Sequence, residues 1–96
     1  MARFYAIADI AEARAYLEHA LLGPRLAEAT DAVLAYAGRI SAEALLGGID
    51  AIKLRSSMTL FEAAAEGAAT TRFAAVLAGF YRGERDSATL QRLAPS

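Results

Sequence analysis

The fold is decided by one stretch, TRFAAVLAGFYRG at residues 71–83, which has the clearest helical pattern in the chain. Its large apolar side chains recur every three or four residues and so line one face of a helix: Phe73, Val76, Leu77 and Phe80. Thr70 or Thr71 can open this helix, and Gly83 can end it. The stretch therefore predicts an amphipathic helix whose apolar face belongs to a core.

The segments before this stretch have helix signals of the same kind. Asp9 and Glu12 have the spacing of a capping box, which predicts a first helix after Asp9. Gly23-Pro24 is expected to stop that helix and to start a second one over about residues 24–37, because proline suits the first helical position. Ser41 is expected to cap a short helix at residues 42–46.

The same signals continue to the C-terminal end. Asp50 is expected to cap a helix over about residues 51–65, and Asp86 a last short helix that runs through Leu90 and Leu93. No segment alternates apolar and polar residues as a strand does. The sequence therefore predicts an all-α fold, a compact array of about five or six short helices in a single domain over residues 1–96.

Composition excludes several classes of function. Lys and Arg number 10 and Asp and Glu number 11, so the chain lacks the basic excess that binding to nucleic acid requires. There is no cysteine, which excludes disulfides and thiolate chemistry and fits a cytoplasmic protein. No apolar run approaches the length of a membrane-spanning helix. A lone histidine, His19, without an HxxxH or HExxH motif predicts no metal site, and no cofactor motif is present.

The segment IKLRSSMTLF at residues 52–61 resembles the signature of the bacterial domain of unknown function family 1810. Further matches precede and follow it in the same order: Tyr5-Ala6-Ile7, Glu12 to Leu17, Leu22 to Leu26, Phe73, Val76-Leu77, Phe80, Gly83, Asp86 and Thr89-Leu90. The resemblance thus extends over essentially the whole chain. It implies an all-α fold and no particular activity.

The chain departs from that family in two respects. Family members carry an additional N-terminal region with an aromatic segment, whereas this chain has no tryptophan and is expected to correspond to the C-terminal two-thirds of the family. They also tend to have proline after the histidine equivalent to His19, where this chain has Ala20. Any site built from the aromatic segment would be missing here.

One polar cluster within the signature is a candidate ligand-binding site: Lys53, Arg55, Ser56 and Ser57. A helix N-terminus offers free N–H groups and a partial positive charge to an anion, and these side chains add donors. Yet Lys53 and Arg55 lie about 160° apart around a helix. The alternative interpretation has each charge pairing with a neighbour and Ser57 bonding back to a carbonyl of its own helix. Glu62 and Glu66 are expected to form a solvated face.

Two hypotheses of function remain open, and the sequence does not decide whether the chain is an enzyme. The first is a non-catalytic interaction module with a protein partner or with itself, without nucleic acid or membrane. A symmetric homodimer is expected to use Phe4, Tyr5 and Ile7, since exposed apolar patches mark interfaces; these residues could instead fold back onto the helical body. The second hypothesis is a small-molecule or nucleotide (anion) binding protein, or an enzyme, that uses the cluster from Lys53 to Ser57.

Overall fold

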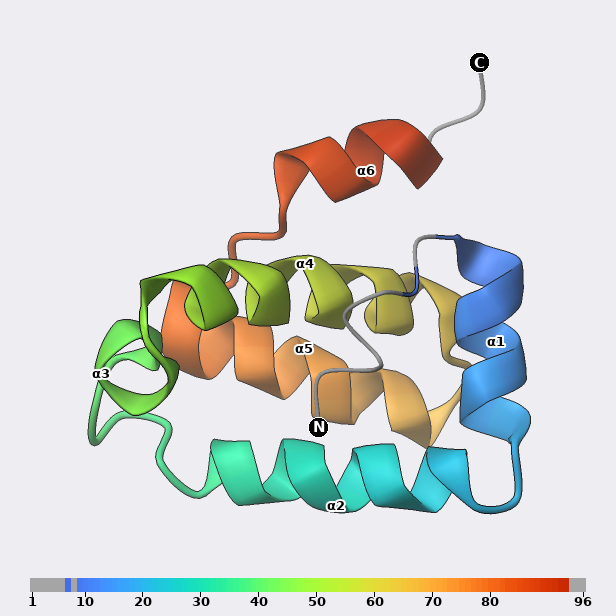
Figure 1. The fold of residues 1–96 in the computed structure, drawn as a ribbon, viewed down its shortest axis with the longest axis horizontal. Coiled ribbons are helices and arrows are strands. Elements are labelled where there is room, and N and C mark those ends of the chain that lie inside the picture. The colour runs from blue at the N-terminus through green and yellow to red at the C-terminus, as the bar shows by residue number, and fades with distance from the viewer. Residues whose placement is uncertain (1–6, 8, 94–96) are drawn as a thin grey trace.

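The computed structural model describes residue 7 and residues 9–93, and every regular element within them is a helix (Figure 1). In chain order the helices are α1 (Ile10–Glu18), α2 (Leu22–Leu34), α3 (Ala42–Leu46), α4 (Gly48–Ala64), α5 (Ala68–Tyr81) and α6 (Ser87–Leu93). The expected all-α array of five or six short helices is confirmed for this part of the chain.

Helix α4 lies at the centre of the arrangement. It contacts α1, α3, α5 and α6, whereas α2 contacts α1 and α5. Figure 1 shows α4 and α5 side by side, with α2 beyond α5 and α6 on the opposite side of α4. Helix α1 crosses one end of this pair and α3 lies at the other end. Most long-range packing in the described chain therefore involves the helix that carries the signature segment.

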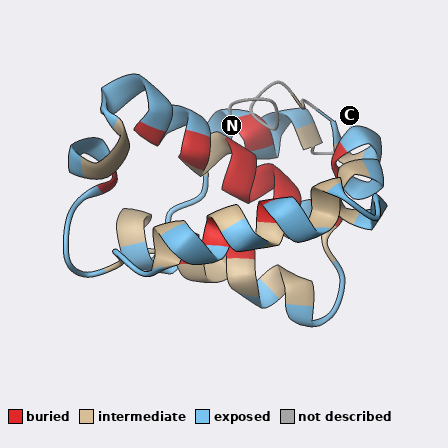
Figure 2. Cartoon of the chain, turned by 60° about the horizontal axis from the view of Figure 1, so that its bottom comes forward, coloured by how far each residue is buried: buried red, intermediate tan, exposed pale blue. Residues whose placement is uncertain are grey.

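The core is built between α4 and α5, where buried residues gather (Figure 2). Phe61 of α4 stacks on Phe73 of α5 with ring centroids 5.6 Å apart, and Tyr16 of α1 lies 5.8 Å from the Phe61 ring. Val76 and Leu77 are fully buried. This burial confirms the apolar face predicted for residues 71–83. Large aromatic and aliphatic side chains stabilise a fold most when they are removed from water.

Three of the five predicted N-terminal caps are confirmed. Asp9 Oδ1 accepts a hydrogen bond from Glu12 N at 2.8 Å, Ser41 Oγ from Ala44 N at 3.0 Å, and Asp86 Oδ2 from Thr89 N at 2.9 Å. The prediction for Asp50 is wrong, since α4 begins at Gly48 and Asp50 lies in its first turn. Gly47 makes this earlier start possible with a φ of 88°, which side chains disfavour.

The predicted break at Gly23-Pro24 is also wrong, because both residues lie in the first turn of α2. Helix α1 ends at Glu18, and His19 Nδ1 accepts hydrogen bonds from Leu21 N and Leu22 N, each at 3.1 Å. Gly23 is required by close approach, since a Cβ there would lie 2.3 Å from the carbonyl oxygen of Leu17. The imidazole thus supplies the partners that free N–H groups need at a helix start.

The other helix ends differ from the prediction by a few residues. Helix α2 ends at Leu34 rather than near residue 37, and α5 begins at Ala68, before the two threonines. Ends of helices are set by only one or two hydrogen bonds, so local sequence locates them loosely.

Ile7 is half-buried and packs against the core cluster, whereas Phe4 and Tyr5 lie outside the described residues. The predicted contact through these three residues stays a prediction. In the part of the chain that the structure describes, no helix is both long enough and apolar enough to cross a membrane.

Candidate functional site

The four residues of the predicted ligand site do not come together. Lys53 is exposed, and its side chain makes no ion pair or hydrogen bond with a described residue. Ser57 is buried at 5% exposure, and its hydroxyl makes no hydrogen bond within residues 7 and 9–93. Arg55 instead faces the chain between α5 and α6, and Ser56 faces Thr89 of α6. The structure therefore joins two of the four residues to a different segment.

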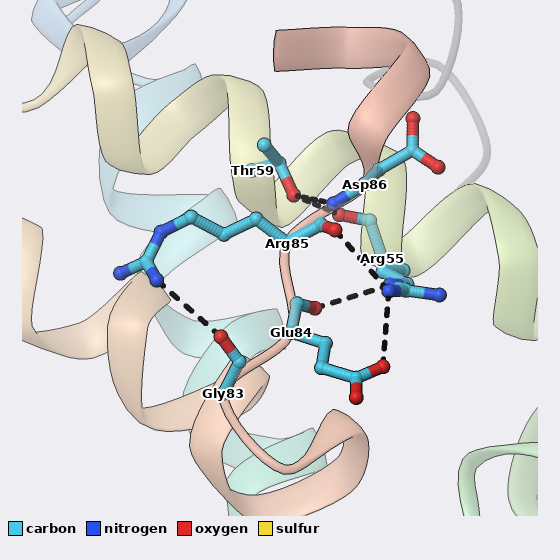
Figure 3. Close-up of polar contacts among 6 residues, drawn as sticks. All are labelled: Arg55, Thr59, Gly83, Glu84, Arg85 and Asp86. Carbon is cyan, nitrogen blue, oxygen red and sulfur yellow. Dashed lines mark hydrogen bonds and ion pairs between the residues drawn. The ribbon is translucent and has the colours of Figure 1, made fainter.

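Arg55 holds the α5–α6 connection, residues 82–86, against α4 (Figure 3). Its Nε donates to the carbonyl oxygen of Glu84 at 3.1 Å, and its Nη2 donates to that of Arg85 at 3.2 Å. Nη2 also lies 3.5 Å from the Glu84 carboxylate, and the guanidinium carbon is 5.9 Å from the centre of the Tyr81 ring. The planar fork of arginine suits this double recognition of backbone carbonyls.

Thr59, one turn further along α4, extends this contact. Its hydroxyl donates to the carbonyl oxygen of Arg55 at 2.8 Å and accepts from the backbone N–H of Asp86 at 2.9 Å (Figure 3). The expected bond back to a carbonyl is thus made by Thr59 and not by Ser57. Because Thr59 is 1% exposed, the backbone N–H of Asp86 would be left without a partner in a buried place if the hydroxyl were removed.

Ser56 reaches α6 through Thr89, which is itself fully buried. The Thr89 hydroxyl donates its only hydrogen to Asp86 Oδ2 at 2.7 Å. Ser56 Oγ, at 2.8 Å, must therefore donate to Thr89 Oγ1. Arg92 Nη2 donates to the same oxygen at 3.3 Å. The threonine hydroxyl thus connects α4 to the start of α6.

Asp86 has an altered acidity because of this arrangement. The side-chain hydrogen bond from Thr89 holds the pKa of the Asp86 carboxyl below its usual range. Partial burial opposes this shift, while the Thr89 backbone N–H and the charges of Arg55 and Arg92 add to it. Hydrogen-bond donors stabilise an ionised carboxylate, so the folded chain favours the charged form of Asp86.

Glu62 completes the contact from the last part of α4. Both oxygens of its carboxylate accept from Arg85, with Arg85 Nε at 2.5 Å from Oε1 and Nη2 on Oε2. This pair raises the pKa of the Arg85 guanidinium above its ordinary value, through the hydrogen bond first and charge attraction second. The Glu62 side chain is only 12% exposed, so the expectation of a solvated face is wrong for it. Glu66 is exposed, as expected.

The whole arrangement fastens the α5–α6 connection and α6 onto one side of α4. Four side chains of α4 take part: Arg55, Ser56, Thr59 and Glu62. Sequence reasoning identified the first two as ligand-binding candidates and missed their partners in residues 84–89. The partners are largely backbone groups, which leave no mark in a sequence, although the close succession of charges at Glu84, Arg85 and Asp86 did offer a signal for the ion pair.

No three side chains of the metal-binding types converge among the described residues. His19, the one histidine, caps the start of α2, and its Nδ1 already accepts two backbone N–H groups. A general base needs a free lone pair within reach of a reacting group.

Comparison with known proteins places this chain in a family. It belongs to the family described as protein of unknown function (DUF1810), whose family model matches residues 1–93. The resemblance carried by residues 52–61 is thereby confirmed. No curated protein matches the chain.

One solved structure is closely similar, the crystal structure of the conserved hypothetical protein Rv1873 from Mycobacterium tuberculosis. The two share 44% sequence identity and a TM-score of 0.84. The match covers 94% of this chain and 62% of that chain, so this chain spans less than two thirds of its relative's length.

Proposed function

We propose that this DUF1810 protein is a non-catalytic interaction module that binds a second copy of itself. The contact surface is the α3 end, defined by the exposed side chains of Tyr36, Ile40, Ile49 and Ile52. The observation that carries the proposal is the exposure of two isoleucines on α4, 73% for Ile49 and 68% for Ile52.

The exposed apolar residues are unevenly distributed. Among the described residues six large apolar side chains are exposed, and the four of the α3 end come from residues 36–52. Figure 1 shows that α2 ends, α3 lies and α4 begins at this one end of the molecule. Single exposed apolar side chains are ordinary, but a concentration of them is typical of an interaction site.

The polar side chains of the signature support a non-catalytic role. The donors of Ser56 and Thr59 are directed at Thr89 and at a backbone carbonyl. Two donors of Arg55 bind carbonyl oxygens of the α5–α6 connection. These groups stabilise the fold. The α3 end, in contrast, has large apolar side chains that are exposed to water.

The α3 end is complementary to itself in charge. Asp50 and Lys53 each follow one of the two isoleucines on α4, and both are exposed. If two copies of α4 cross antiparallel, Ile49 of each lies opposite Ile52 of the other, and Lys53 of each lies near Asp50 of the other. A two-fold axis requires such a self-complementary surface. This pairing of charges favours a second copy of the chain as the partner of the α3 end.

The proposed dimer is weak. Fully burying one isoleucine contributes about 1.5–3 kcal/mol, so four of them contribute at most about 6–12 kcal/mol. Association costs about 4–15 kcal/mol in lost freedom of motion. We therefore expect a reversible dimer that forms only at high protein concentration.

Sedimentation equilibrium of the unmodified chain over a wide concentration range tests the proposal. The wild type should pass from monomer to dimer, and the double variant Ile49→Ser with Ile52→Ser should remain a monomer throughout. Leu21→Ser is the matched control, since Leu21 is 51% exposed in the α1–α2 connection, away from α4. A wild type that stays monomeric, or a control that loses association as the double variant does, would rule out the proposed contact.

Charge reversal tests the antiparallel geometry separately. Lys53→Asp should weaken association, because it places like charges together across the two-fold axis. Adding Asp50→Lys should restore association, because the pair is then merely exchanged. Failure of this second substitution to restore the dimer would contradict the antiparallel arrangement.

A further inference from the structure

A recess lies beside the α5–α6 connection, outside the contact surface proposed above. Its volume is about 240 Å³, and its lining residues are Arg55, Phe80, Tyr81, Arg82 and Glu84. We propose that this recess binds a phosphate group carried on a small molecule, with Arg55 and Arg82 as its two cationic ligands.

Arg55 is held in place before any ligand arrives. Two backbone carbonyls fix its Nε and Nη2, and the Tyr81 ring lies against the guanidinium. Its Nη1 makes no hydrogen bond with a described residue, so donors of this fixed group remain for an anion. A fixed guanidinium loses little freedom of motion on binding.

The present counter-ion of Arg55 is easily displaced. Its contact with the Glu84 carboxylate is a single one at 3.5 Å, and the Glu84 side chain is 71% exposed. Exposed ion pairs of this kind contribute little to stability. Glu84 thus occupies the position on Arg55 that an incoming oxyanion would take.

Arg82 is the second cation and has an unusual backbone. It is the only residue other than glycine in the described chain with a positive φ, 57°, at the position that ends α5. Glycine is the usual residue at such a helix end, because a side chain is strained at a positive φ. The Arg82 side chain is exposed and makes no ion pair or hydrogen bond with a described residue. The strained backbone presents an unpaired guanidinium at the recess.

The surroundings determine the class of ligand. Phosphate is a dianion near neutral pH, and two guanidinium groups match it in charge and in donor geometry. The last carbonyls of α5 oppose an anion, but that of Tyr81 already accepts from the backbone N–H of Glu84 at 2.9 Å. Phe80 and Tyr81 add aromatic surface for a planar group attached to the phosphate.

Nuclear magnetic resonance titrations at constant ionic strength test the site, with inorganic phosphate and adenosine monophosphate as the two probes and chloride as the reference. Both probes should give saturable shifts at the amides of residues 80–85. Tighter binding of the nucleotide would assign the aromatic wall to its base, whereas equal binding would assign the site to the phosphate alone. No saturable shift with either probe would overturn the proposal.

Three variants distinguish this recess from general attraction of anions. Arg82→Gly should weaken binding about tenfold, the effect of losing one charge-assisted hydrogen bond, and it should remain folded because glycine suits the positive φ. Glu84→Gln should strengthen binding, because the competing carboxylate is gone. Arg25→Gln, at an exposed position of α2, is the matched control and should bind as the wild type does. Wild-type affinity in Arg82→Gly, or equal weakening in Arg25→Gln, would contradict the assignment.

Discussion

The two halves of α4 differ in how many of their residues are buried. From Ser57 to Phe61 every residue is buried, on all sides of the helix. From Gly48 to Ser56 only Ala51 and Leu54 are buried, and two isoleucines face solvent. One continuous helix therefore serves as core in its second half and presents an apolar surface in its first. Whether an apolar residue of α4 is buried therefore depends on which helices pack against it, and not on how apolar the residue is.

Substitutions in the buried second half of α4 should have the largest effect on the free energy of unfolding. Phe61→Ala should destabilise the chain by about 3–5 kcal/mol, because Phe61 is fully buried and contacts the rings of Tyr16 and Phe73. Urea denaturation checks the value. Phe61→Leu provides a milder change if the alanine variant does not fold. A loss below about 0.5 kcal/mol for either, the range of surface changes, would show that the second half is not core.

The two buried hydroxyls of the second half should respond differently. Thr59→Val keeps the shape but leaves the Asp86 backbone N–H without a partner, so it should cost about 1–3 kcal/mol. Ser57→Ala should change stability by less than about 0.5 kcal/mol, since its hydroxyl has no described hydrogen bond. Paired denaturation curves decide the matter. Equal losses would contradict the distinction between the two sites.

Acid should weaken the attachment of α6 to the second half of α4. The pKa of Asp86 is lowered in the folded chain, so its contribution to stability is present above the unfolded value of about 3.9. That contribution is lost as pH falls through the lower folded pKa. Asp86→Asn should remove it, and the variant's free energy of unfolding should fall less than the wild type's between pH 5 and pH 2, roughly the range that such a carboxylate spans. Parallel curves for the two proteins would refute this role.

Changes on the exposed face of the first half should have the smallest effect on the monomer. Ile52→Ser, measured at a protein concentration where no dimer forms, should shift the free energy of unfolding by less than about 0.5 kcal/mol. A loss of 2 kcal/mol or more, typical of buried isoleucine, would place Ile52 in the core and remove the contrast between the halves.

Local sequence predicted those parts of the fold that depend on neighbours in the chain. The apolar face of Phe73, Val76 and Leu77 and the caps at Asp9, Ser41 and Asp86 all follow from spacings of three or four residues. The cap at Asp50 failed because Gly47, three residues earlier, could begin the helix with a positive φ. The predicted break at Gly23-Pro24 was wrong because the His19 side chain caps the second helix earlier in the chain. The sequence around His19 does not indicate this role.

The candidate site was predictable only in part. The family was identified correctly from the sequence, but the partners of Arg55 are carbonyl groups about thirty positions away. Any residue has a carbonyl, so no pattern in the sequence points to Glu84 and Arg85 as partners. Burial of Glu62 likewise depends on Arg85 folding across it. Polar residues at helical spacing therefore indicated importance without revealing whether they bind a ligand or a neighbouring segment.

The central claim is that the exposed face of the first half of α4, with Ile49 and Ile52, is a contact surface, while the second half is core. Amide chemical shifts of the chain, followed by nuclear magnetic resonance as the protein is diluted, test it directly. The account predicts concentration-dependent shifts confined to the α3 end, from Tyr36 to Ile52, with residues 57–64 and α6 unchanged. Shifts that are absent at all concentrations, or that map to α6 and the second half of α4, would contradict it.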